Sequence, residues 1–154
     1  MDNLSKASRS YCMSRIRGKN TGIEVILRRE LHRLGLRYGL HRRDLAGTPD
    51  IVFTTAKVAV FVNGDFWHGF GYPRWRRKLS PSWRKKIELN RKRDKRSVQK
   101  LRRSGWRVVT VWQHQVERNL NECVGRVIRQ VDPGRRGPRR AKGTPSARGP
   151  SPRP

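Results

Sequence analysis

Two stretches of the chain carry the apolar spacing of an amphipathic helix. The first covers residues 21–34: it opens with the capping-box pattern "TGIE", repeats apolar residues three or four positions apart, and is followed by Gly35, which suits a helix end. The second covers residues 81–103, with Ser80 as the expected cap and Gly105 as the stop signal. We expect each helix to turn its apolar face inward.

Four apolar runs are typical of β-strands. Three of them lie at residues 37–41, 51–53 and 58–62, and the short "TTAK" between the last two predicts a hairpin. The fourth, "WRVVTVW" at residues 106–112, is rich in β-branched residues. The order helix, three strands, helix, strand predicts an α/β fold in one domain, with a mixed central sheet flanked by helices.

Two polar residues interrupt the inward-facing stripe of the second helix. Asn90 and Asp94 stand where the helical spacing calls for apolar side chains. A buried carboxylate is costly unless a partner compensates its charge. Asp94 could therefore form a structural ion pair with an arginine, or it could orient a catalytic histidine. Both interpretations fit the sequence.

Asp50 stands between a turn and an apolar strand in "GTPDIVF". One interpretation is that its carboxylate caps the turn, as aspartate often does. The other is that a carboxylate fixed at a strand end binds a divalent cation together with a phosphate oxygen. The next apolar strand also ends in polar residues, and this pairing favours the second interpretation.

The stretch "FVNGDFWHG" contains those polar residues. Because a hairpin brings its outer ends together, we expect Asp50 and Asn63 at one edge of the sheet. His68 has a proton affinity near neutral pH, which suits it to activate a water for attack on phosphorus, although a histidine at the surface or the edge of the core would look the same. Phe66 and Trp67 would by default belong to the core.

The charge of the chain indicates a polyanionic partner. Among 154 residues there are 38 Lys+Arg against 11 Asp+Glu, a formal net charge of +27, which favours nucleic acid over an anionic membrane. No apolar stretch approaches the roughly 20 residues that span a bilayer, and no signal-peptide pattern opens the chain. Cys12 and Cys123 lack CxxC spacing, which suits a reducing compartment. We expect a cytoplasmic, nucleoid-associated protein.

Three segments together resemble the very short patch repair (Vsr) DNA mismatch endonucleases, a branch of the PD-(D/E)XK nuclease superfamily. They are "MSRIRGKNTGIEVILRRELHRLGLRYGLHRRDLAGTPDIVF", "VAVFVNGDFWHG" and "WRKKIELNRKRDKRSVQKLRRSGWRVVTVW". The resemblance implies a single PD-(D/E)XK-type (restriction-endonuclease-like) domain at residues 21–131, after a basic DNA-contacting arm at residues 1–20. Residues 132–154, rich in Pro, Gly and Arg, lie outside it and are expected to form a disordered basic tail.

The resemblance also implies roles for single residues. Asp50 corresponds to the aspartate that binds magnesium, and the backbone carbonyl of Val62 completes that metal site. His68 corresponds to the histidine that activates the water, and Asp94 to an acidic residue of the active site. Glu24 corresponds to a glutamate near the site, although its place in the capping box is also a sufficient explanation.

Three further positions correspond to side chains that wedge into the DNA base stack beside a mispair: Met13, Phe66 and Trp67. A weakened base step lowers the cost of such unstacking. Neighbouring side chains of an extended segment point in opposite directions, so Phe66 and Trp67 should not both face one core, which favours the wedge. Asn63 replaces a histidine of the family's prototypes, which removes one candidate acid or phosphate contact.

The prototypes also hold a structural zinc ion. Its ligand positions are occupied in this chain by Asp65, Phe70, Tyr72 and His114. Two ring side chains cannot replace thiolate and imidazole in a tetrahedral shell, so we predict no zinc. Packing of Phe70, Tyr72 and Trp75 is expected in its place.

The function that follows is a magnesium-dependent endonuclease that nicks duplex DNA at a mispair, with T·G as the expected one. One alternative is a restriction-type endonuclease on the same fold, and another is a DNA-binding module with impaired cleavage, which Asn63 would favour. The expected partner is double-stranded DNA with a mismatch. A cytosine methyltransferase and mismatch-repair proteins are further candidates, and the protein is expected to be a monomer.

Overall fold

The structure is a computed structural model that describes residues 21–135. Residues 1–20, which contain Met13, and residues 136–154 lie outside the described part. The elements, in chain order, are α2 (Gly22–Arg33), β1 (Gly39–Leu40), β2 (Ile51–Phe53), β3 (Val58–Asn63), α3 (Tyr72–Trp75), the 3-10 helix η1 (Arg76–Lys78), α4 (Pro81–Arg103), β4 (Arg107–Trp112), α5 (Gln113–Arg118) and α6 (Leu120–Val131). No helix within residues 21–135 is long and apolar enough to cross a membrane.

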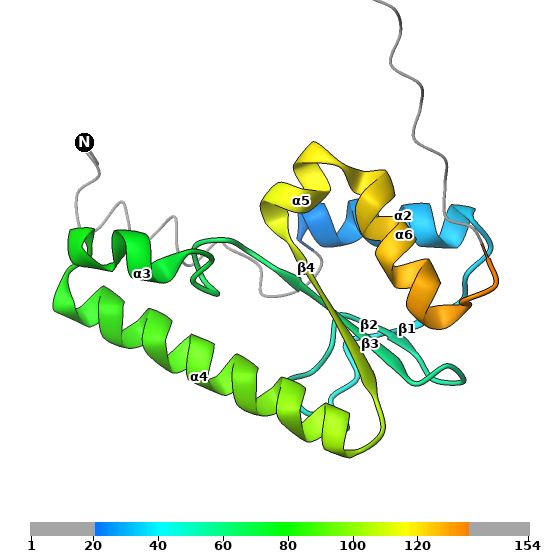
Figure 1. Cartoon of the computed structure of the whole chain (residues 1–154), viewed down its shortest axis with the longest axis horizontal. Helices are drawn as coiled ribbons and strands as arrows, with labels where there is room; N and C mark the ends of the chain where they lie inside the picture. The colour runs from blue at the N-terminus through cyan, green and yellow to red at the C-terminus, as the bar shows by residue number, and fades with distance from the viewer. Residues whose placement is uncertain (1–20, 136–154) are drawn as a thin grey trace, which may run out of the picture.

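A mixed sheet of four strands, in the order β1-β2-β3-β4, forms the centre of the fold. β1 and β3 both run antiparallel to β2, whereas β3 and β4 are parallel, with Asn63 opposite Trp112. α2, α5 and α6 lie on one side of the sheet and α4 crosses the other (Figure 1). The predicted α/β architecture, a mixed sheet flanked by helices, is confirmed.

The main core lies between the sheet and the helices α2 and α6. Alternate residues of a strand face the same side, and those of β3 and β4 that face these helices include Val58, Val60, Val109 and Val111. The helices contribute Leu27, Leu31, Cys123, Val124, Val127 and Ile128. Burying each large apolar side chain is worth about 1.5–3 kcal/mol, so this layer fixes the strands from whose ends the predicted site residues extend.

Residues 113–131 form α5 and α6, although no element was predicted for them. The pattern was present in the sequence, because buried apolar residues recur at helical intervals from Cys123 to Ile128. Asn119 also caps α6, its side chain accepting from the Glu122 N–H at 3.1 Å. α5 follows β4 without any intervening glycine or proline, so the usual boundary signal is missing.

The other predicted elements are confirmed, with one shortened strand. The run at residues 37–41 is a strand only at Gly39–Leu40. Tyr38 instead donates its hydroxyl to the Arg28 carbonyl at 2.5 Å, which ties this segment to α2. Ser80 occupies the N-cap position of α4, but its side chain caps no helix N–H group.

Two loops approach α4 closely, and each does so at a glycine. Gly47 has φ +76°, and a Cβ there would lie 2.7 Å from the Cβ of Ser97. Gly69 has φ +68°, and a Cβ there would lie 2.7 Å from the Cδ of Arg91. A side chain at either position would be strained by the positive φ, and at Gly47 it would also clash with the Cβ of Ser97, which cannot move away. α4 therefore sets the position of both loops, which carry predicted site residues.

The four positions considered for zinc cluster beside the end of β4. Asp65 Oδ1 lies 2.8 Å from His114 Nδ1, and the rings of Phe70 and His114 are 4.3 Å apart between centroids. Tyr72 is 2 % exposed and packs edge-on against Trp75, whose Nε1–H donates to the Phe70 carbonyl. An ion pair and ring contacts thus join the turn after β3 to the β4–α5 corner.

We predict that the purified protein holds no stoichiometric zinc and that a zinc-selective chelator leaves its melting temperature unchanged. The reason is that Phe70 offers no ligand atom and Asp65 is already paired with His114. Elemental analysis and thermal melts measure both quantities. About one equivalent of zinc per chain would contradict the prediction. As a control, Asp65→Asn should lower the melting temperature with or without chelator, because it weakens the ion pair.

Candidate functional site

A cleft of about 1200 Å³ opens between the start of α2, the hairpin β2–β3 and the middle of α4. All five residues predicted to be catalytic line it, as does Val62. The five are Glu24, Asp50, Asn63, His68 and Asp94. They come from α2, β3, α4 and two loops, so the fold gathers side chains that are far apart in the sequence. Of the three predicted wedge residues, Trp67 lines this cleft, and Met13 lies outside the described residues.

Asp50 immediately precedes β2 and is tied to the neighbouring strand β3. Its Oδ2 accepts a hydrogen bond from the Val62 N–H at 2.7 Å, so its carboxylate bridges the hairpin rather than capping the turn before it. Burial raises the pKa of Asp50 to about 6, with a further rise from the nearby negative Glu24, while the Val62 N–H bond and His68 act to lower it. A carboxylate desolvated to this degree is strongly stabilised by any cation that reaches it.

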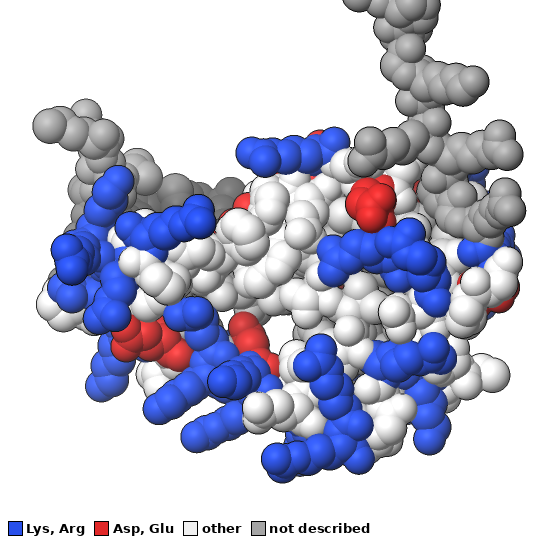
Figure 2. Space-filling model, in the orientation of Figure 1, with Lys and Arg blue, Asp and Glu red and all other residues white. Residues whose placement is uncertain are grey.

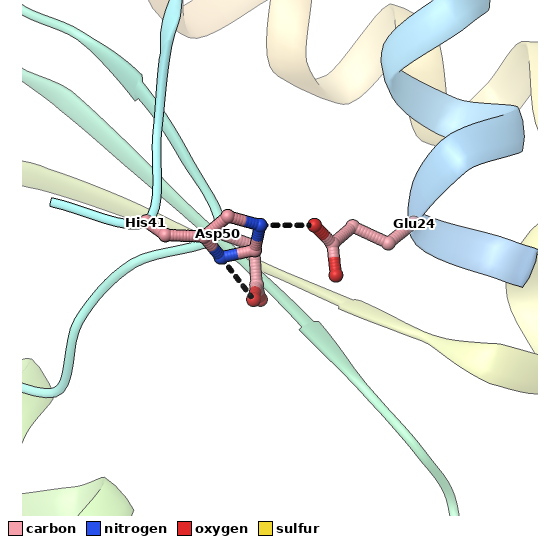
Figure 3. A group of neighbouring side chains, drawn as sticks. All are labelled: Glu24, His41 and Asp50. Atoms are coloured by element: carbon pink, nitrogen blue, oxygen red, sulfur yellow. Dashed lines mark ion pairs between the residues drawn. The ribbon is translucent and has the colours of Figure 1, made fainter. Parts of the chain in front are cut away.

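Glu24 projects from the first turn of α2 toward Asp50, with His41 between them (Figure 3). His41 Nε2 lies 2.9 Å from Glu24 Oε1, and His41 Nδ1 lies 3.9 Å from Asp50 Oδ1. Glu24 is 2 % exposed, and its Oε1 also pairs with Arg28 Nη1 at 3.6 Å, although this oxygen has no hydrogen bond of regular geometry within residues 21–135. One ligand atom from each side chain fits within 4.8 Å of the others, so this group could hold a metal ion.

The sequence pattern did not indicate His41. It follows β1 directly, where a φ of +47° turns the chain out of the sheet, and its N–H donates to the Asp50 carbonyl. The register pairs Leu40 with Ile51, so antiparallel pairing of the first two predicted strands would have placed His41 opposite Asp50. Helix capping involves only the backbone of Glu24, whose N–H donates to Thr21 Oγ1. Its carboxylate instead lines the cleft and pairs with His41.

His68 and Asp94 form the second polar group of the cleft. His68 Nδ1 lies 2.6 Å from Asp94 Oδ2, and both side chains are about 30 % exposed, at 27 % and 30 %. Asp94 therefore pairs with a histidine, and the described residues show no ion pair between it and an arginine. When Nδ1 carries the proton that Asp94 accepts, Nε2 is left as an acceptor for a proton from water.

The two asparagines near this pair have different surroundings. Asn90, on the inner face of α4, donates its side-chain N–H to the Trp67 carbonyl at 3.1 Å and so holds the turn that carries His68. Asn63, at the end of β3, is 9 % exposed and lines the cleft. An amide does not titrate, so Asn63 can offer hydrogen bonds but cannot act as an acid or a base.

Phe66 and Trp67 belong to an aromatic cluster that also contains Trp75 and Trp83. The ring centroids are 5.5 Å apart for Phe66–Trp67, 5.6 Å for Phe66–Trp75 and 5.6 Å for Trp67–Trp83. The premise that the first two rings must point in opposite directions is wrong, because residues 65–71 form turns and not a strand. Phe66 is 38 % exposed, so the cluster is packed yet partly open to solvent beside the cleft.

Several known proteins are similar to this chain in sequence. The family model for the DNA mismatch endonuclease Vsr matches residues 1–74. The chain is similar to the type II nicking enzyme V.XorIIP of Xanthomonas oryzae pv. oryzae, with 43% identity over 137 residues, covering 86% of this chain and 98% of that protein. It is also similar to V.NmeDIP, a type II nicking enzyme of Neisseria meningitidis serogroup C, with 35% identity over 85% of this chain and 90% of that one. The DNA mismatch endonuclease Vsr of Escherichia coli is 35% identical, over 70% of each chain. The chain therefore belongs to the Vsr family of DNA mismatch endonucleases.

Proposed function

We propose that this protein cuts one strand of duplex DNA beside a mispair, that the mispair is T·G, and that magnesium is the cofactor. The observation that carries the proposal is a single cleft lined by Glu24, His41 and Asp50 and also by the His68–Asp94 pair. Such a site can hold a cation and place the proton-accepting imidazole of His68 close to the same phosphate. The names of the nicking enzymes among its relatives support the cutting of one strand rather than two.

Asp50 and Glu24 are the residues that would hold magnesium, with the backbone carbonyl of Val62 as a further oxygen donor. Their fit rests on two desolvated carboxylates, one with a raised pKa and one with a buried oxygen that lacks a regular hydrogen bond from residues 21–135. Once bound, the cation would polarise the scissile phosphate and stabilise charge on the leaving oxygen. Magnesium prefers oxygen ligands, so we assign His41 to orienting the Glu24 carboxylate.

His68 supplies the proton chemistry of the proposed reaction. Asp94 accepts from Nδ1–H and thereby leaves Nε2 to take a proton from a water in the cleft. The oxygen of that water attacks the phosphorus, the bond from phosphorus to the leaving oxygen breaks, and its electron pair departs with that oxygen. Asp94 then stabilises the imidazolium that His68 has become.

The two alternatives differ from this proposal in their products. A restriction-type endonuclease on the same fold would cut both strands of matched DNA, and an impaired module would bind without cutting. The neutral Asn63 favours the module, whereas the intact His68–Asp94 pair supports cleavage. A cytosine methyltransferase and mismatch-repair proteins are proposed as partners of a monomeric enzyme.

Three labelled duplexes, each incubated with the protein and magnesium, distinguish these functions. One contains a T·G mispair, one is matched and methylated, and one is matched and unmethylated. Nicking confined to the mispaired duplex supports the proposal. Cleavage of both strands in matched DNA would indicate restriction. Binding to all three without any cut would indicate the module.

Asp50→Asn should abolish nicking and raise the melting temperature in the absence of divalent ions. The pKa of Asp50, about 6, lies above its ordinary value of 3.8, so the folded state binds the proton more tightly than the unfolded state. Above that pKa the ionised side chain opposes folding by up to about 3 kcal/mol, and the amide removes this cost. The gain should shrink as the pH falls through about 6 toward 4, where the wild-type carboxyl is also neutral.

Thermal melts with and without magnesium give a second readout of the same variant. Magnesium should raise the melting temperature of the wild type and leave that of Asp50→Asn unchanged, because the metal site has lost its charged ligand. Magnesium-dependent nicking by Asp50→Asn would refute the assignment of Asp50.

His68→Ala and Asp94→Asn should each slow nicking by about 10²- to 10⁴-fold, and the double variant should be little slower than either. The two side chains act as one unit, so the second loss removes nothing further. Asp65→Asn is the matched control, because it weakens a similar aspartate–histidine pair that does not line the cleft. Equal slowing in this control would argue against a chemical role for His68.

Trp67→Ala should weaken binding to a mispaired duplex by about 10- to 100-fold, because a base–aromatic stack is worth about 1–3 kcal/mol. Salt-sensitive binding to matched DNA should persist, since the cations are untouched. Trp83→Ala is the control: it removes a ring from the same cluster that does not line the cleft, and mispair discrimination should survive. A large drop in melting temperature with unchanged discrimination in Trp67→Ala would mean that the ring is only part of the core.

A further inference from the structure

The side of α4 that points away from the cleft carries a row of cations. Lys85, Lys92, Arg96 and Arg103 are all exposed. At about 100° per helical residue they lie within about 20° of a single line along the helix. Among the described residues none of the four forms an ion pair with a carboxylate. We call these four residues the basic stripe.

The basic stripe faces solvent along the length of α4. Figure 2 shows Lys and Arg side chains standing out along the lower border of the molecule, where Figure 1 places this helix. The stripe extends over 18 residue steps of α4, Lys85 to Arg103, or about 27 Å at 1.5 Å per residue. That length approaches one turn of B-DNA, about 34 Å.

The cleft and the basic stripe lie on opposite sides of α4, so the DNA segment that enters the cleft cannot also contact the stripe. Asp94 faces the cleft, and Lys92 and Arg96 each lie about 160–200° around the helix from it. A helix with its side chains is about 10–12 Å thick, so α4 separates the two surfaces. The cleft has cations of its own, Arg43 and Arg93.

We propose that the basic stripe is a second binding surface for duplex DNA, separate from the cleft, which contacts phosphates without reading bases. Lys and Arg at regular intervals along a rigid helix match a backbone that carries a negative charge about every 1.7 Å. An anionic membrane is the poorer fit, because a helix that lies on a membrane also needs a free apolar face. The apolar side of α4 is occupied, with Ile87 and Leu101 buried against the rest of the fold.

This surface gives the protein a hold on flanking or neighbouring duplex that does not depend on the cleft. Sequence-independent phosphate contacts let a protein stay on DNA while it moves between sites. The proposal goes beyond strand nicking and does not rest on the identity of the mispair.

Two variants of the full chain test it, each with four cations changed to glutamine and hence the same net charge. The stripe variant changes Lys85, Lys92, Arg96 and Arg103. The control variant changes four exposed cations on elements other than α4, namely Arg29, Arg37, Lys57 and Arg118. Thermal melts should show both variants folded, because all eight side chains are exposed.

Binding to a matched duplex of about 40 base pairs is then measured against KCl concentration. The slope of log K against log salt should fall by about 3–4 in the stripe variant, since each phosphate contact contributes about 0.9. In the control variant it should change by less than about 1. Equal slopes in the two variants would overturn the proposal.

A second measurement counts short duplexes bound per chain by sedimentation at low salt. With duplexes of about 12 base pairs, too short to reach around α4, the stripe variant should bind one fewer than the wild type and the control variant. The same number for all three proteins would also overturn the proposal. Nicking is assayed separately. A protein that cuts none of the duplexes would contradict the proposed function but not the proposal that the basic stripe binds DNA.

Discussion

The burial of acidic side chains at the end of a small sheet is the constraint on which the site depends. Asp50 and Glu24 lie close together, and burial raises the pKa of Asp50 to about 6, with a further rise from Glu24. Only a well-packed structure around them can hold two such acidic groups close together. That structure is the core between the sheet and the helices α2 and α6, together with the hydrogen bond from the Val62 N–H to Asp50 across the hairpin. The free energy of packing thus maintains a site that favours a cation.

α4 organises the other half of the cleft. Its inner face carries Asp94, which pairs with His68, and Asn90, which donates to the Trp67 carbonyl in the turn that carries His68. Gly47 and Gly69 let two loops approach this helix closely enough to complete the cleft. Its outer face carries the basic stripe. The two polar residues that interrupt the apolar pattern of this helix, Asn90 and Asp94, both contact the turn that carries Trp67 and His68.

Periodicity predicted most elements because each is defined by local signals. α2 and α4 have clear spacing and end signals, and the hairpin β2–β3 is bounded by a short turn. α5 was missed because it follows β4 without a break, and α6 was missed although its apolar spacing and its Asn119 cap are present in the sequence. The turns at residues 65–71 overturned the expectation that Phe66 and Trp67 point apart, since the rule of alternation holds only in a strand. Local pattern cannot report such a change of backbone direction.

The sequence by itself determined the class of the fold, the excess of positive charge and the types of side chain available for chemistry. It indicated Asp50, His68 and Asp94 as candidates but left the partner of Asp94 open. Tertiary structure alone decided that this partner is His68, and that His41 stands between Glu24 and Asp50. The physical reason is that pairing, burial and the resulting pKa values depend on distances between segments that are remote along the chain. Those distances are set by strand register and helix packing, which no single segment encodes.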